Sequence, residues 1–229
     1  NINSDDITSS LWLRLAGLIN TLSLRDDIDG FVITHGTDTM EETAFFLHLV
    51  VKTEKPVVVT GAMRPSTATS ADGPMNLYQS IVVASSREAR GRGVVCVFSD
   101  SIYCARDFQK LSTTSVTAFG GRDFGMMGYV LDRRVLLYNT SLKPHTTASE
   151  FSVDGISSLP KVGILLFHVD ADPSLISFAA KGNDGLVIVG AGNGNYSKAY
   201  NEAIGELSIP VVRSSRIGNG MIVPDSAFD

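Results

Sequence analysis

The sequence has few cysteines and no long apolar run. Two cysteines, Cys96 and Cys104, stand among 229 residues, and they form neither a Cys-x-x-Cys pair nor a disulfide framework. Cys96 lies in an apolar strand-like run, where a free cysteine packs as a small hydrophobic residue. No apolar stretch approaches the roughly 20 residues that a transmembrane helix needs. We therefore expect no disulfide scaffold and no membrane partner.

Positive charge is also scarce. The chain carries 19 Lys and Arg against 24 Asp and Glu, which gives a net charge of −5. A protein that holds nucleic acid through its phosphates needs clustered Lys and Arg. The one basic run, residues 87–92, follows a predicted helix, and cations are typical of a helix C-terminus. The composition therefore predicts no nucleic-acid partner.

The most informative stretch runs from Gly30 to Leu47. Phe31 to Ile33 is a short β-branched apolar run bounded by glycine, which predicts a strand buried on both faces. Thr39 to Glu42 fits the Thr-x-x-Glu capping box, and the apolar stripe that follows predicts a helix. Between strand and helix lies a tight polar turn, residues 35–38. In α/β proteins such turns face helix N-termini at the carboxyl ends of parallel strands, where ligands bind.

Strands and helices also alternate on either side of this stretch. The pattern predicts strands over residues 57–60 and 94–98, separated by a helix that starts with Asp72 as cap and Pro74 in its first turn. Another helix is predicted before the central stretch, over residues 11–22, with Ser9 or Ser10 as its cap, and residues 128–139 predict a hairpin. This order favours an α/β fold whose parallel sheet is flanked by helices.

We expect two domains. Residues 1–140 form the larger N-terminal α/β domain, which carries the active site. Residues 141–160 are rich in Ser, Thr, Pro and Lys with little periodicity, which is typical of a linker. Residues 161–229 restart the alternation of strands and helices and predict a smaller α/β domain of the flavodoxin or Rossmann type.

Thr37 and Asp38, in the turn after the central strand, suggest nucleophilic or water-activating chemistry. A hydroxyl is a poor nucleophile until a base takes its proton, and a desolvated lysine can serve as that base. The same residue types also cap helices, so a purely structural role is the alternative on the residues alone. The spacing does not say which lysine approaches the turn.

Two weaker motifs and two isolated histidines carry less information. Gly190 to Asn195 reads Gly-x-Gly-x-Gly and no acidic residue follows at the ribose position, which argues against a nucleotide cofactor. His168 to Asp172 has metal-ligand residue types without a companion cluster, which favours a strand-end loop. His35 and His48 have no motif partners, so we expect His35 to belong to the turn and His48 to a helix surface. No metal and no cofactor are expected.

Five segments match the motifs of one family in that family's order. They are residues 35–44, 61–78, 106–110 with its Ser/Thr-rich tail, 192–195 and 212–216. The match extends over essentially the whole chain. On these segments the sequence resembles the bacterial-type L-asparaginase family, also called asparaginase/glutaminase.

The resemblance implies an amidohydrolase that cleaves the side-chain amide of L-asparagine to L-aspartate and ammonia. Thr37, Asp38 and Lys110 would form a Thr-Lys-Asp triad, and Asp38 would also bind the substrate's α-ammonium. The backbone around Thr37 and Ala62 would stabilise the oxyanion, because preorganised N–H groups act where negative charge develops.

Further roles follow from the resemblance alone. Ser4 would hold the substrate carboxylate, and Asp5 takes the next position, where relatives carry Gln or an acidic residue. Asn195 would complete the site of a neighbouring subunit, because family members assemble as dimers of intimate dimers. The sequences of residues 41–46 and 70–74 resemble those of exported asparaginases more than those of cytosolic ones.

The resemblance departs from the family pattern at both ends. Family members begin with a strand and a Thr-Gly-Gly-Thr-Ile turn that supplies the primary nucleophilic Thr, and they end in helices that lend an acidic residue to the partner's site. Nothing here matches either feature, and residues 1–6 lack an initiator Met. We therefore expect the sequence to be the interior of a full-length enzyme.

Two alternatives stay open. A glutaminase-asparaginase shares all these motifs and differs in whether its substrate pocket has room for the one extra methylene of glutamine. One methylene contributes only about 1 to 3 kcal/mol to discrimination between the two substrates. If the nucleophilic Thr is truly absent, a non-catalytic amino-acid-binding module is the alternative from another class.

Overall fold

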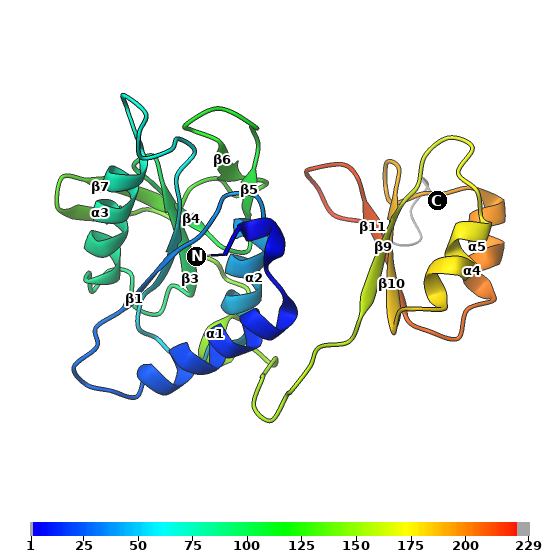
Figure 1. Cartoon of the computed structure of the whole chain (residues 1–229), viewed down its shortest axis with the longest axis horizontal. Helices are drawn as coiled ribbons and strands as arrows, with labels where there is room; N and C mark the ends of the chain where they lie inside the picture. The colour runs from blue at the N-terminus through cyan, green and yellow to red at the C-terminus, as the bar shows by residue number, and fades with distance from the viewer. Residues whose placement is uncertain (1, 224–229) are drawn as a thin grey trace. The chain divides into compact units, whose positions relative to one another are not determined.

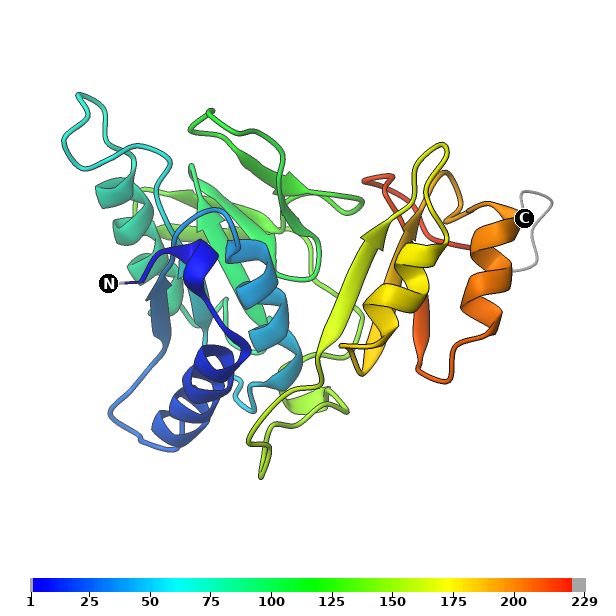
Figure 2. The same cartoon turned by 45° about the vertical axis from the view of Figure 1, so that its right-hand side comes forward.

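The computed structural model describes residues 2–223. The chain divides into two compact units, Asn1–Ser158 and Leu159–Asp229. The elements of the first unit, in chain order, are η1 Ser4–Asp6, α1 Ser9–Leu22, β1 Phe31–Thr34, α2 Met40–Val50, β2 Val57–Thr60, α3 Gly73–Ala84, β3 Val94–Phe98, β4 Ser101–Cys104, β5 Phe108–Lys110, β6 Phe119–Gly121, β7 Gly128–Leu131, β8 Arg134–Leu137 and η2 Thr146–Ala148 (Figures 1 and 2).

The main sheet of the first unit has the order β1-β2-β3-β4-β7-β8. Strands β1, β2 and β3 run parallel, which confirms the predicted strand–helix–strand repeats. Strands β4, β7 and β8 extend the sheet antiparallel, so the sheet is mixed rather than purely parallel. The cause is the tight turn after β3, where Ser99 and Asp100 both adopt positive φ values of 48° and 66°. Two such residues close a two-residue hairpin, and the next strand must then run antiparallel.

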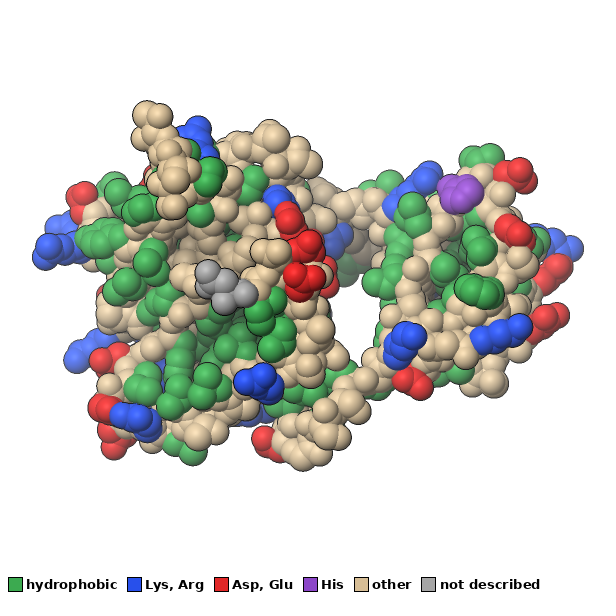
Figure 3. Space-filling model, viewed as in Figure 1, with side chains coloured by type: hydrophobic (Ala, Val, Ile, Leu, Met, Phe, Trp, Pro, Cys, Tyr) green, Lys and Arg blue, Asp and Glu red, His purple; other side chains and the backbone are tan. Residues whose placement is uncertain are grey.

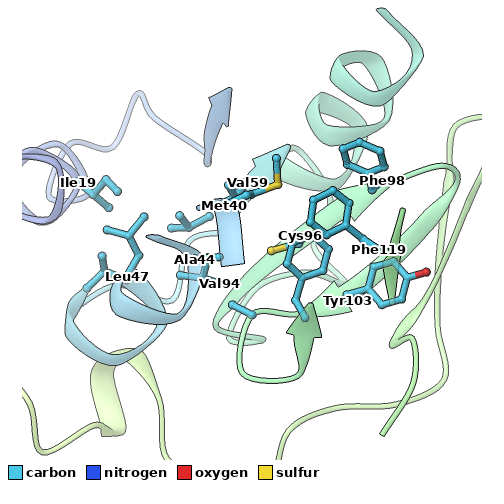
Figure 4. Packing of buried hydrophobic residues seen from close by; sticks show 14 of the residues in the cluster. Ile19, Met40, Ala44, Leu47, Val59, Val94, Cys96, Phe98, Tyr103 and Phe119 are labelled. Carbon is cyan, nitrogen blue, oxygen red and sulfur yellow. The ribbon is translucent and has the colours of Figure 1, made fainter. Parts of the chain in front are cut away.

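Helices cover both faces of this sheet. Helices α1 and α2 lie on one face and α3 on the other (Figure 1). Figure 4 shows Ala44 and Leu47 of α2 packing toward Val94 and Cys96 of the sheet. On the opposite face Val83 of α3 joins a second apolar cluster with residues of β2, β3 and β4. The apolar stripe predicted for the central helix is confirmed, as is the burial of Cys96.

Two expectations for the central stretch were wrong. Residues Phe31 to Ile33 are only half-buried, because among the described residues β1 pairs with β2 alone and lies at the end of the sheet. Helix α2 does begin after Thr39, but no capping box forms. The Thr39 hydroxyl donates instead to the carbonyl oxygen of Ser4, at 2.6 Å.

His48 is fully buried, so its predicted place on a helix surface was also wrong. It follows Ala44 by four positions and therefore lies on the same, core-facing side of α2. Its Nδ1 accepts the backbone N–H of Val94 at 3.2 Å, and its ring packs 4.9 Å from that of His145. Helix α1 begins after Thr8 rather than after Ser9 or Ser10, and Thr8 makes no capping bond to the helix backbone.

Much of the Ser/Thr-rich segment after β8 packs on the first unit. The Lys52 amine, just past α2, donates to the carbonyl oxygens of Thr146 and Ser149 at 3.0 and 2.8 Å. Thr146 is buried. The first unit therefore continues to Ser158, beyond residue 140, because these bonds hold a segment whose composition is typical of a linker.

The second unit is a smaller α/β unit, as predicted. Its elements are β9 Val162–Leu166, α4 Ser174–Ala180, β10 Gly185–Gly190, α5 Lys198–Gly205 and β11 Val211–Ser215. The three strands run parallel in the order β11-β10-β9. Helices α4 and α5 share one face of this sheet (Figure 2), where Ile176 and Tyr200 pack on Leu186 and Ile188. None of the helices within residues 2–223 is long and apolar enough to cross a membrane.

Candidate active site

Strand β5 carries Lys110 to the turn between β1 and α2. Its amine lies 3.0 Å from Thr37 Oγ1 and 2.6 Å from Asp38 Oδ1. The three side chains that the sequence resemblance groups as a triad therefore meet at one point of the first unit. A hydroxyl, an amine and a carboxylate in mutual hydrogen-bond reach can exchange protons with a bound molecule.

The triad is open to solvent on the carboxylate side. The side chain of Lys110 is 20% exposed, whereas that of Asp38 is 69% exposed. An ion pair this exposed contributes little to folding stability. The arrangement therefore leaves one carboxylate edge of Asp38 accessible to a small cationic group, while the lysine stem is held in the protein.

Glu41, in the first turn of α2, fixes the backbone of Lys110. Its Oε2 accepts the Lys110 N–H at 2.6 Å. Burial raises the pKa of the Glu41 carboxyl, and the hydrogen bond from Lys110 partly opposes that rise. Sequence reasoning missed this contact, because Glu41 and Lys110 are 69 positions apart and no local pattern joins them.

Ser4 packs directly against the triad turn. It is buried, and its Oγ accepts the Asp38 backbone N–H at 3.3 Å. A Cβ on Gly36 would lie only 2.7 Å from that Oγ, so this close approach requires glycine. The Ser4 hydroxyl proton is thus directed away from the Asp38 amide. Asp5, the next residue, is exposed.

Ala62 lies across a cavity from the turn. Gly36 and Ala62 both line a space of about 330 Å³, together with Thr60 and Gly61 at the end of β2. Asp72 holds the loop after Ala62, because its carboxylate accepts the backbone N–H groups of Met63 and Arg64 at 2.9 Å each. A larger cavity of about 780 Å³ lies between α3 and the β7–β8 hairpin, but it is not lined by the triad.

Asn195 lies in the second unit, in the loop between β10 and α5. Its backbone bridges that of Ala191, and its Oδ1 accepts from Arg213 at 2.5 Å. The Gly-rich loop 190–195 therefore forms a compact turn in which Gly192 and Gly194 take positive φ values. The geometry of this loop is consistent with a structural role for its glycines.

The other weak motif forms a strand-end loop. His168 Nδ1 donates to the carbonyl oxygen of Val169 at 2.8 Å, and Asp172 accepts the Ser174 N–H at 2.9 Å before α4. Within residues 2–223 no group of three or more His, Cys, Asp or Glu side chains is placed to hold a metal ion.

Family models match both units. A model described as asparaginase, N-terminal, matches residues 1–143, and one described as glutaminase/asparaginase C-terminal domain matches residues 161–228. The chain belongs to the asparaginase family. Together the two matches cover the five segments on which the sequence resemblance was based.

Individual relatives agree with this assignment. L-asparaginase 2 of Escherichia coli (strain K12) is 43% identical over 233 residues, which cover 100% of this chain and 66% of that protein. A probable periplasmic L-asparaginase of Haemophilus influenzae is 44% identical, with the same two coverages. The crystal structure of a probable cytoplasmic L-asparaginase from Campylobacter jejuni matches with a TM-score of 0.94 at 43% identity, over 100% of this chain and 74% of that one. The chain thus spans 66% of the length of these curated relatives.

Proposed function

We propose that the protein is an L-asparaginase, which hydrolyses the side-chain amide of L-asparagine to L-aspartate and ammonia. The observation that carries the proposal is the position of the Lys110 amine between the Thr37 hydroxyl and the Asp38 carboxylate. The names of the relatives support it, since the Escherichia coli and Bacillus subtilis relatives are both L-asparaginases.

The triad would manage the protons of the reaction. As an ammonium, Lys110 donates to both Thr37 and Asp38 and so fixes the threonine hydroxyl in one orientation. As a neutral amine, it accepts the hydroxyl proton of Thr37 and makes that oxygen reactive. Asp38 stabilises the positive charge whenever Lys110 is protonated. In the net reaction the amide C–N bond breaks, water supplies the oxygen of the new carboxyl group, and one water proton leaves with the nitrogen as ammonia.

The surroundings of the triad suit a zwitterionic amino acid. Acidic side chains gather over η1 and the start of α2 (Figure 3), where Asp5, Asp6, Glu41 and Glu42 lie. In the proposal the exposed carboxylate of Asp38 binds the substrate's α-ammonium, together with the negative field of these neighbours. Ser4 holds the α-carboxylate through its hydroxyl, with Asp5 beside it, and the backbone N–H groups at Thr37 and Ala62 receive the oxyanion.

Glutamine is the second candidate substrate. Several relatives at 38 to 40% identity are named glutaminase-asparaginase. One methylene changes kcat/KM by about 10-fold to 200-fold. We propose asparagine as the preferred substrate because the relatives from Escherichia coli, Haemophilus influenzae and Bacillus subtilis, at 42 to 44% identity, are named L-asparaginase.

Assembly and location are part of the same proposal. We propose a homo-oligomer, a dimer of dimers, in which Asn195 completes the site of a neighbouring subunit. Relatives include proteins named periplasmic and cytoplasmic. We favour an exported protein, because the sequences of residues 41–46 and 70–74 resemble those of exported asparaginases.

Ammonia release tests the proposal directly. The purified protein with its natural N- and C-terminal ends is incubated with asparagine or with glutamine, and kcat/KM is measured for each substrate. The proposal predicts ammonia and aspartate from asparagine, at a higher kcat/KM than from glutamine. A higher value on glutamine favours the glutaminase-asparaginase alternative. Binding of aspartate by calorimetry without any ammonia release would support the non-catalytic amino-acid-binding module and refute the enzyme.

A further inference from the structure

A chain of hydrogen bonds runs from α1 to the turn that carries Thr37. The indole Nε1–H of Trp12 donates to Thr43 Oγ1 at 2.7 Å, and Thr43 Oγ1 lies 2.8 Å from Nε2 of His35. The other ring nitrogen of His35, Nδ1, lies 2.7 Å from the carbonyl oxygen of Gly36. Thr43 is almost fully buried, so the middle of this chain is closed to water.

The chemistry of the partners assigns the protons. A carbonyl oxygen only accepts, so Nδ1 of His35 carries a proton and donates it to Gly36. In the neutral ring Nε2 is then bare, and it accepts the hydroxyl proton of Thr43. Thr43 accepts in turn from Trp12, whose indole nitrogen only donates. Each hydrogen bond then has one donor and one acceptor, and the chain ends on the Gly36 carbonyl oxygen.

The last bond of this chain determines where the Thr37 amide points. In a trans peptide the C=O and N–H groups lie on opposite sides of the chain, and the described residues contain no cis peptide. Drawing the Gly36 carbonyl toward His35 therefore turns the Thr37 N–H away from the ring. Within residues 2–223 this N–H donates no hydrogen bond to the protein, which leaves it available to a bound molecule.

Gly36 makes such an anchor necessary. The approach of Ser4 excludes a Cβ at this position, and a glycine without an anchor can rotate its peptide more freely than any other residue. A rotated Gly36–Thr37 peptide would present a carbonyl oxygen where a donor is needed. The geometry points to His35 as a positioning residue that keeps the Thr37 N–H directed at the oxyanion. This inference rests on the proposed amide hydrolysis.

The effect should appear in the chemical step rather than in substrate binding. An oxyanion donor contributes in the transition state, and loss of one costs about 10²-fold to 10³-fold in kcat. Loosening the donor instead of deleting it costs less. We expect His35→Leu to lower kcat about 10-fold, with the dissociation constant for aspartate unchanged.

Two variants separate positioning from plain stability. In His35→Asn the amide Nδ2 takes the place of ring Nδ1 and can still donate to Gly36, so kcat should return to within about threefold of the wild type. His168→Leu is the matched control, because His168 makes the same bond to the carbonyl of its next residue but has no link to the triad turn. It should leave kcat unchanged.

For the wild type and each variant we measure kcat and KM for asparagine and the melting temperature. All proteins carry their natural N- and C-terminal ends. Unchanged kcat in His35→Leu would overturn the inference. So would equal losses in the Leu and Asn variants at equal melting temperatures, because the Asn variant keeps the donor.

A spectroscopic measurement covers the remaining cases. If His35→Leu does not fold, ¹⁵N NMR of the ¹⁵N-histidine-labelled wild type reports which ring nitrogen of His35 is protonated. Protonation at Nδ1 supports the inference, and a neutral ring protonated at Nε2 refutes it. If the wild type releases no ammonia at all, the proposed function fails, and the same spectrum still decides whether His35 holds the Gly36 carbonyl.

Discussion

The backbone N–H of Lys110 donates to Oε2 of Glu41 at 2.6 Å, although the two residues are 69 positions apart. The bond joins the end of β5 to the first turn of α2, which directly follows Thr37 and Asp38. The amine of Lys110 and the turn that it meets are therefore held by the same helix.

Glu41 should control the placement of the Lys110 amine. Replacing it with Leu leaves the Lys110 N–H without its acceptor, and a displacement of about 1 Å can cost on the order of 10²-fold in rate. We expect Glu41→Leu to lower kcat by about 10-fold to 100-fold. Glu41→Gln keeps an oxygen acceptor in place and serves as the control, with a loss below about threefold. The check is steady-state ammonia release, and equal rates in the two variants would contradict the assigned role.

The Thr37 hydroxyl should be needed for turnover. Thr37→Ala removes the oxygen that Lys110 contacts at 3.0 Å, so we expect kcat to fall by at least about 10³-fold. Thr37→Ser keeps the hydroxyl and should retain a substantial part of the rate. Circular dichroism and the melting temperature show whether both variants fold. An alanine variant with nearly full kcat would remove the Thr37 hydroxyl from the mechanism.

His48 should make the protein sensitive to acid. Burial, followed by the positive charges of His145 and Arg106, lowers the pKa of His48 from 6.5 to about 3. The unfolded chain therefore binds a proton at His48 near pH 6.5, whereas the folded protein does not until about pH 3. Between pH 6.5 and about pH 3 this difference removes about 1.4 kcal/mol of unfolding free energy per pH unit, and above pH 6.5 it has no effect.

The matched variant for this prediction is His48→Asn. Its Oδ1 can still accept the Val94 N–H that His48 Nδ1 accepts now, but its side chain does not titrate. Urea unfolding at pH 7 and pH 5 should show a smaller loss of stability in the variant than in the wild type. Equal losses would mean that another group causes the acid sensitivity.

Local patterns predicted the elements better than their ends. Strands β2 and β3 and helix α3 follow from apolar periodicity and from Pro74 in the first turn of α3, because apolar spacing and proline act within a few positions. Asp72 does precede α3, but its side chain makes no capping bond and accepts the backbone N–H groups of Met63 and Arg64 instead. Thr39 shows the limit of this reasoning. Its hydroxyl bonds to Ser4, 35 positions away, and no local pattern contains that partner.

Long-range contacts explain the other differences. The turn at Ser99 and Asp100 contains no glycine, so its positive φ values and the antiparallel strand after it had no sequence signal. His48 was predicted on the helix surface because histidine is polar, although its spacing of four from Ala44 indicates the buried side of α2. The bonds of His35 to Thr43 and Gly36 were also missed, because they depend on the path of the turn between β1 and α2 and on the orientation of the His35 ring.

The meeting of Lys110 with Thr37 and Asp38 came from the family resemblance and from no pattern in the chain itself. A separation of 72 positions between Lys110 and Asp38 carries no information on distance. The residues alone predicted less. They indicated a hydroxyl and a carboxylate at the end of a parallel strand, and a hydroxyl that would need a base to become a nucleophile.

The turnover number of Lys110→Met on asparagine tests the central claim most directly. Methionine keeps most of the apolar stem and removes the amine that Thr37 and Asp38 contact. With the melting temperature and aspartate binding close to those of the wild type, the account predicts that ammonia release falls by at least about 10³-fold. A folded Lys110→Met protein with wild-type kcat would contradict it.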